Sequence, residues 1–142
     1  MGRIRRTGLL GIGLAGIAFA AAGCGAEDFA NDPRPPAPIE MTAKVSDDQV
    51  LVSPIRFDGK PVGAGLASVT IANLGGETTE LTFSGPQEPR TTDPIIANGV
   101  LDYKIDLRPG QYTVSAADEA VRPMQFTVGP ERPSAQNDLL LP

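Results

Sequence analysis

The stretch from Leu101 to Leu107 constrains the fold of this chain more than any other. It reads LDYKIDL, in which every second side chain is apolar and each residue between is charged. Successive side chains of a β-strand point to opposite faces, so this pattern gives one apolar face and one polar face. We therefore expect a half-buried strand here.

The same period of two recurs along the chain, and no long stretch has helical spacing. Short turn-rich segments such as "SDD", "NLGGE", "SGPQEP" and "ANG" separate the runs. Roughly seven to nine short strands in about 90 residues predict an all-β fold, an antiparallel Greek-key β-sandwich over residues 39–130. The alternating runs are Met41–Val45, Ala67–Ile71, Leu81–Phe83, Leu101–Leu107, Tyr112–Ala116 and Met124–Val128.

The turn "LRPGQY" joins two of these runs. Pro109 followed by Gly110 suits a type II turn, because the glycine supplies the positive φ. Type II turns splay two-residue hairpins, so we expect this turn to carry the chain from one sheet to the other. The arrangement resembles the tyrosine corner of immunoglobulin-like sandwiches, which implies a hydrogen bond between the Tyr112 hydroxyl and nearby backbone.

The start of the chain predicts export. Residues 1–23 carry three arginines and no acid, and the apolar stretch from Leu9 to Ala22 is shorter than the roughly 20 residues that a bilayer span needs. A positive start, a short apolar centre and small residues at its end are typical of a secretory signal peptide. Arg5 and Arg6 leave both the general secretory route and twin-arginine export open.

The four residues Ala21, Ala22, Gly23 and Cys24 resemble the lipobox of bacterial lipoproteins, with Ala21 at the position where leucine is usual. The resemblance implies that the Cys24 thiol receives a diacylglycerol, that a peptidase cuts before it, and that acyl chains such as palmitate anchor the protein. The alternatives are a free thiol or a disulfide, but Cys24 is the only cysteine. We expect a lipid-anchored protein on the extracytoplasmic face of the cell membrane.

Residues 24–38 are expected to hold the lipidated cysteine and an extended linker. Proline dominates the end of this segment, "DPRPPAP", and favours polyproline II. At roughly 3 Å per residue, such a spacer would hold the following domain up to ~40 Å from the lipid surface.

Two longer stretches resemble the cupredoxin-like layout. They are "VSPIRFDGKPVGAGLASVTIANLGG" and, later, "LDYKIDLRPGQYTVSA" with "MQFTV", so the likeness covers about Val52 to Val128. The resemblance implies the fold, whereas copper sites of that family use two histidines, a cysteine and often a methionine. The chain has no histidine, and Met124 is expected to lie in the core. The whole chain is also similar to small actinobacterial lipoproteins of unassigned function.

The sequence offers little catalytic chemistry. A histidine base is absent, and no motif pairs a serine with one of the three lysines, Lys44, Lys60 and Lys104. The acid pairs Asp47-Asp48 and Asp118-Glu119 suit turns, because adjacent strand residues face opposite sides. Acids are too sparse for a calcium site. We expect no enzyme activity, no metal and no cofactor.

The charge balance points away from nucleic acid. The formal net charge is −5, with 12 basic and 17 acidic residues. Removing residues 1–23, which hold three arginines, leaves 9 basic residues and a net charge of −8. Phosphate binding needs a basic surface, so neither nucleic acid nor anionic lipid headgroups are expected partners of the domain.

Two segments suggest interactions. Residues 131–142 end in "NDLLLP" and are read either as an edge strand of the sandwich or as a docking peptide. The glycine-rich "FDGKPVGAG" is read as a flexible connection or as a loop lining a binding rim. Our leading hypothesis is a non-catalytic envelope protein that binds or supports another envelope component. The alternative is a small-ligand or metal/redox accessory carrier of cupredoxin-like ancestry that has lost copper.

Overall fold

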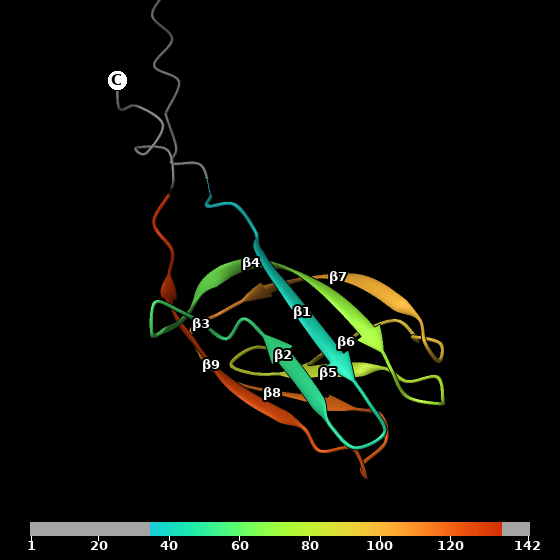
Figure 1. The fold of residues 1–142 in the computed structure, drawn as a ribbon. Coiled ribbons are helices and arrows are strands. Elements are labelled where there is room, and N and C mark those ends of the chain that lie inside the picture. The colour runs from blue at the N-terminus through green and yellow to red at the C-terminus, as the bar shows by residue number, and fades with distance from the viewer. Residues whose placement is uncertain (1–34, 135–142) are drawn as a thin grey trace, which may run out of the picture. The chain divides into compact units, whose positions relative to one another are not determined.

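The computed structural model describes residues 35–134, and in this part of the chain all regular structure is β (Figure 1). Pro35 to Pro38 have no regular secondary structure. Nine strands follow: β1 (Ile39–Val45), β2 (Val50–Ser53), β3 (Arg56–Phe57), β4 (Lys60–Asn73), β5 (Leu81–Ser84), β6 (Arg90–Thr91), β7 (Val100–Leu107), β8 (Gly110–Ala116) and β9 (Met124–Glu131). Within residues 35–134, no helix is long and apolar enough to cross a membrane.

The strands form one continuous hydrogen-bonded path in the order β2-β1-β4-β9-β8-β5-β6, with β7 and β3 attached to β4. The path does not close on itself, and it folds into a sandwich-like arrangement of two layers. One layer contains β2, β1, β4 and β7, and the other contains β9, β8, β5 and β6 (Figure 1).

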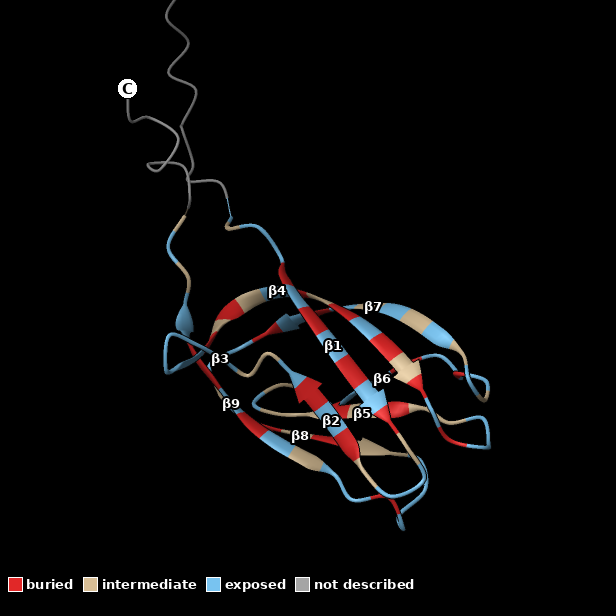
Figure 2. Cartoon of the chain, in the orientation of Figure 1, coloured by how far each residue is buried: buried red, intermediate tan, exposed pale blue. Residues whose placement is uncertain are grey.

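The alternating runs are strands, as the sequence predicts, and their apolar residues form one core between the layers (Figure 2). β1 follows the period of two along its whole length, with buried and exposed residues in strict alternation. Met124 packs against the core in a half-buried position, and its Sδ accepts a hydrogen bond from the Val52 N–H at 2.9 Å. The methionine expected in the core therefore lies at the margin of the core.

The prediction of purely antiparallel strands is wrong, because the sheet is mixed. β1 lies parallel to β4, with Ile39 opposite Ala67 and Val45 opposite Asn73, and β9 also lies parallel to β4. The strands β2 and β3 intervene between β1 and β4, so the chain returns to its starting end and β4 repeats the direction of β1. Side-chain alternation shows which face is buried but not which way the neighbouring strand runs.

The glycine-rich "FDGKPVGAG" is neither a flexible connection nor a rim loop. Asp58 and Gly59 have φ values of 50° and 77° and form a two-residue hairpin turn in which Phe57 pairs with Lys60. Positive φ at both central positions is the favoured hairpin geometry for an Asp-Gly pair. The remaining residues of the segment form the start of β4.

β4 serves both layers. Its first part, Val62–Ala64, pairs with β9, and its second part, Gly65–Ala72, pairs with β7. Gly65 has φ 123°, a conformation that a residue with a side chain rarely adopts, and it marks the point where the strand passes between layers. The strand therefore joins the two layers along one continuous backbone.

Candidate functional site

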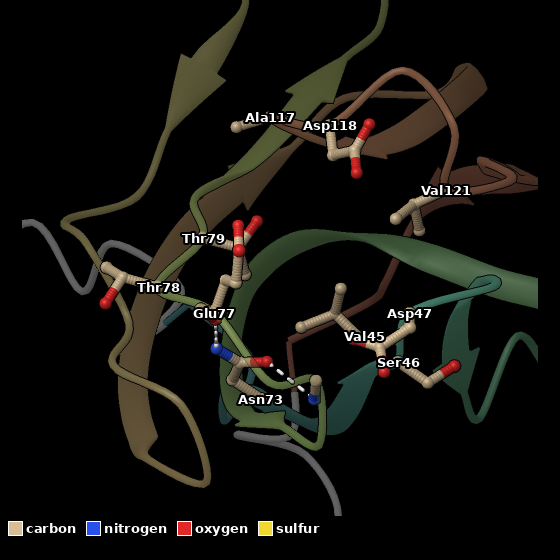
Figure 3. A pocket seen from close by; sticks show the side chains of 11 residues that line it. Val45, Ser46, Asp47, Asn73, Glu77, Thr78, Thr79, Ala117, Asp118 and Val121 are labelled. Carbon is tan, nitrogen blue, oxygen red and sulfur yellow. Dashed lines mark hydrogen bonds between the residues drawn. The ribbon is translucent and has the colours of Figure 1, made fainter.

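One group of loops surrounds a hollow at the end of the domain where β1 and β4 finish. A hollow of about 360 Å³ opens there between the segments that follow β1, β4 and β8. Val45, Ala117 and Val121 contribute apolar side chains to it. Figure 3 shows the hollow with its polar lining, which comprises Ser46, Asp47, Asn73, Glu77, Thr78, Thr79 and Asp118.

Asn73, the last residue of β4, holds this end together. Its side chain is almost fully buried, at 1% exposure. The amide Nδ2 donates to the backbone oxygens of Glu77, Ile95 and Ile96 at 2.7, 2.9 and 3.1 Å. Its Oδ1 accepts from the Gly75 N–H at 2.9 Å. One side chain thus fixes the loop after β4 against the loop before β7.

Two of the carboxylates around the hollow, Asp47 and Asp118, cap turns and are exposed to solvent. Asp47 Oδ1 accepts a hydrogen bond from the Gly76 N–H at 3.0 Å, which ties the β1–β2 turn to the loop after β4. Asp118 Oδ1 accepts from the Ala120 N–H at 2.8 Å. Both carboxylates are exposed at the rim of the hollow, so this rim is suited to a cationic group.

Asp48 lies beside the hollow and is more acidic than an ordinary aspartate. The Ser46 hydroxyl donates to Asp48 Oδ1 at 2.5 Å, and the Arg122 guanidinium lies 3.6 Å from Oδ2. Chiefly the serine bond, with a smaller contribution from Arg122, lowers the pKa of Asp48 below its usual value of 3.8. Both members of the ion pair are exposed, so the pair adds little to stability.

The opposite end of the domain receives the incoming chain. Arg132, just after β9, donates to the Ala37 oxygen at 2.7 Å, to the Ala64 oxygen at 3.3 Å and to the Leu66 oxygen at 3.4 Å. Its side chain crosses β4 where Gly63 and Gly65 leave room for it. The segment before β1 and the segment after β9 are therefore held together at this end of the domain.

The residues predicted from the "LRPGQY" turn lie at this second end. Gly110 has φ 144°, and a Cβ there would lie 2.4 Å from Pro86 Cγ. β7 pairs with β4 whereas β8 pairs with β5 and β9, so Pro109 and Gly110 carry the chain between layers. The Tyr112 hydroxyl accepts a hydrogen bond from the Arg108 N–H at 2.9 Å, the kind of backbone contact expected of it.

The lipidation residues Cys24, Ala21, Ala22 and Gly23 lie outside the described residues, as does the tail beyond Ser134. Asp47-Asp48 and Asp118-Glu119 lie in turns, as expected from their spacing. Among residues 35–134, no three histidine, cysteine, aspartate or glutamate side chains gather as they would around a metal ion.

Sequence reasoning missed the role of Asn73. The signal was available, because an asparagine at the end of an apolar run and directly before "LGG" suits a side chain that bonds to the turn backbone. The long-range partners of Asn73, Ile95 and Ile96, could not be read from that pattern. The Asp-Gly hairpin was missed as well, although this dipeptide is a strong local signal.

Neither a protein-family model nor a curated protein matches the chain. A solved structure described as the crystal structure of Lac15 from a marine microbial metagenome is similar, with 15% sequence identity and a TM-score of 0.41. The similarity covers 68% of this chain and 33% of that one, so the chain spans about a third of the length of that protein.

Proposed function

We propose that the protein is a non-catalytic, lipid-anchored component of the cell envelope that binds a basic surface of another envelope protein. Cys24 would hold it to the extracytoplasmic face of the membrane through a diacylglycerol. The domain would meet its partner at the loops around Asn73. The alternative, a small-ligand or metal/redox accessory carrier, predicts instead a bound small molecule.

The observation that carries this proposal is the separation of two ends along β1. The chain enters beside Ala37, where Arg132 holds it, and β1 then runs seven residues to Val45 beside the hollow. At about 3.3 Å per residue, the two ends are about 20 Å apart. A tether at the first end would leave the second free to meet a partner.

Charge is divided unevenly between these two ends. The loops around the hollow and the strand ends beside them carry Asp47, Asp48, Glu77, Glu80, Asp93, Asp118 and Glu119. Their nearby cations are Lys44 and Arg122. At the chain-entry end, Arg56, Lys60, Arg108 and Arg132 offset the acids. Complementary potentials speed association and disfavour wrong partners, so the acidic end favours a basic partner.

The test is affinity capture from native membranes with the full, anchored chain. The key variant combines Asp47→Asn, Glu77→Gln and Asp118→Asn, which remove charge while the asparagines keep the oxygens that cap the turns. A matched control removes three acids elsewhere: Glu40→Gln, Asp58→Asn and Glu131→Gln. We expect one defined partner to be lost from the first variant and kept by the second.

The anchor is tested in the same experiment with Cys24→Ser, which should release the protein from the membrane fraction. Equal capture by both charge variants would contradict the proposed surface. A small molecule retained in the native mass spectrum of the released protein would favour the carrier. Hydrolase activity that one serine or aspartate substitution abolishes would overturn the non-catalytic assignment.

A further inference from the structure

The outer edge of β7 is not paired with another strand. One hydrogen bond shows which backbone groups of β7 point toward this edge. The Asn73 N–H donates to the Gly99 oxygen, which continues the β4–β7 register of Ala72 opposite Val100. In an antiparallel pair, hydrogen-bonded and non-bonded positions alternate. Odd-numbered residues of β7 therefore bond to β4, and the backbone groups of the even-numbered residues point away from it.

Among the described residues, little covers this edge. β7 pairs with β4 alone, and the Asp106 oxygen accepts one hydrogen bond from the Gln87 side chain at 2.7 Å. The outward backbone groups of Val100, Asp102 and Lys104 are therefore open to another strand. β7 is eight residues long, and the part of its edge from Val100 to Lys104 can template such pairing.

The inner face of β7 is also incompletely covered in the first half of the strand, around Leu101 and Tyr103. Ile105 and Leu107 are buried, whereas Leu101 and Tyr103 are only half-buried against the core. Tyr103 stacks on Phe83 with ring centroids 5.8 Å apart. An added strand with apolar residues on this face would cover both side chains.

The chain leaves the domain beside the end of β7. Glu131 and Arg132 line one hollow of about 540 Å³ together with Asp106, Leu107, Arg108 and Pro109. Ser134 is the last described residue, and residues 135–142, "AQNDLLLP", follow it in the sequence. A strand that starts here and follows the edge would run antiparallel to β7, since β7 itself ends at this hollow.

We propose that residues 135–142 add to the outer edge of β7 as an antiparallel strand, with Asp138 opposite Lys104. This register places Ala135 opposite Leu107 and Pro142 opposite Val100, so the eight residues match the eight of β7. Leu139 and Leu141 then share the inner face with Leu101 and Tyr103. Leu140 lies on the outer face.

Charge selects this register over its neighbours. Leu139 and Leu141 lie on the inner face only if even-numbered tail residues pair with the even-numbered residues of β7, so a register that keeps them there can change only in steps of two. A shift in one direction places Asp138 opposite Asp102, and a shift in the other places it opposite Asp106. Like charges directly opposite destabilise a strand pair, whereas Asp138 opposite Lys104 is favourable.

The surroundings of Lys104 also suit a single acid. A hollow of about 230 Å³ lies beside this part of β7, lined by Gln87 and Tyr103 to Asp106 and by two further cations, Arg90 and Arg108. Asp138 is the one charged residue of the segment 135–142. It would therefore enter a basic place on a protein that is acidic as a whole.

Residue-resolved amide hydrogen exchange tests the proposal with a control built into β7. We compare the full chain with a variant that ends at Ser134. Removing the tail should speed exchange of the Asp102 and Lys104 amides by about tenfold or more, because they lose their partner. The Leu101, Tyr103 and Ile105 amides bond to β4 and should change little. Equal exchange of the even-numbered amides in both proteins would overturn the proposal.

General loss of protection in the truncated protein would show unfolding, so a second variant tests the pairing in the intact chain. Cysteines replace Lys104 and Asp138 in the full chain carrying Cys24→Ser. A hydrogen-bonded antiparallel pair has Cα atoms about 5.5 Å apart, which a disulfide spans. Controls place the first cysteine at Asp102 or Lys44 instead.

We expect a disulfide within one chain between positions 104 and 138, formed at least tenfold faster than in either control. Equal rates in the three proteins would show an unpaired tail and overturn the proposal. A disulfide between two chains would also overturn it, because it would show that the tail adds to the edge of a second copy.

Discussion

At the scale of single residues, Asn73 stabilises the loop end because its one buried side chain bonds to two loops. Replacing it with alanine leaves the buried Gly75 N–H without its partner, whereas the Ile95 oxygen keeps the bond from the Thr79 N–H. A buried group left unpaired costs about 1–3 kcal/mol, so Asn73→Ala should lower the free energy of unfolding by about that amount. Chemical denaturation measures this. Thr78→Ala, exposed on the same loop, is the control, and equal stability of the two variants would contradict the role of Asn73.

The Tyr112 hydroxyl gives a second prediction at this scale. Tyr112→Phe keeps the ring, which stacks on Phe126 at 5.7 Å, but removes the acceptor for the Arg108 N–H. One such bond contributes about 1 kcal/mol, which lowers the melting temperature of a domain of this size by about 4–8 °C. Tyr103→Phe is the matched control. Melting temperatures that fall equally in both variants would show that the hydroxyl bond of Tyr112 has no special role.

Asp48 gives a prediction that depends on pH. Its pKa is lowered in the folded protein, chiefly by the Ser46 hydroxyl, so its contribution to stability is present above pH 3.8 and is lost as pH falls through the folded pKa. Ser46→Ala should raise the pKa of Asp48 toward 3.8, as measured by NMR titration of the carboxyl carbon. Ser53→Ala, on the neighbouring strand, should leave it unchanged. An unaltered titration of Asp48 in the first variant would assign the shift to Arg122 instead.

At the scale of elements, the crossing of Arg132 over β4 depends on glycine. A Cβ at Gly63 would lie 2.5 Å from Arg132 Cγ and 3.1 Å from the Pro130 oxygen. Gly63→Ala should therefore displace Arg132 and cost about 1–3 kcal/mol of stability. Gly76→Ala is the control, because nothing lies within 4 Å of its added Cβ.

The double variant Gly63→Ala/Arg132→Ala tests whether that cost comes from the contact. If alanine at 63 acts by displacing the arginine, the two changes should cost less together than the sum of the single variants. Strict additivity would place the effect of the Gly63 substitution in the backbone of β4 instead. Urea denaturation of the four proteins in the cycle gives these values.

The strands themselves could be predicted because alternation is a local signal, and β1 and β8 follow it closely. The role of β4 could not, since one strand of 14 residues belongs to both layers and its neighbours come from distant parts of the chain. The candidate site escaped prediction for the same reason: Asn73 meets Ile95 and Asp47 meets Gly76 only after folding. Turn chemistry indicated where these loops lie but not which of them face one another.

At the scale of the whole described domain, the acidic loop end and the chain-entry end differ in charge while sharing one core. A short lysine-rich peptide is a direct probe of this difference. In an NMR titration of the protein, we expect shifts confined to residues 46–48, 75–79 and 117–121, because the carboxylates there would attract the lysines. Acids of the strand faces, such as Glu40 and Asp102, share those faces with Lys44 and Lys104 and should respond less.

Salt and charge variants then separate electrostatic attraction from other binding. The Debye length is about 8 Å near physiological ionic strength and about 3 Å at 1 M. The peptide-induced chemical shift changes should therefore shrink steadily as salt is added. The variant lacking the charges of Asp47, Glu77 and Asp118 should lose most of the low-salt response, and the control lacking those of Glu40, Asp58 and Glu131 should keep it. Shifts spread evenly over β1 and β7, or unaffected by salt, would mean that the acidic loops do not form the surface that meets a basic partner.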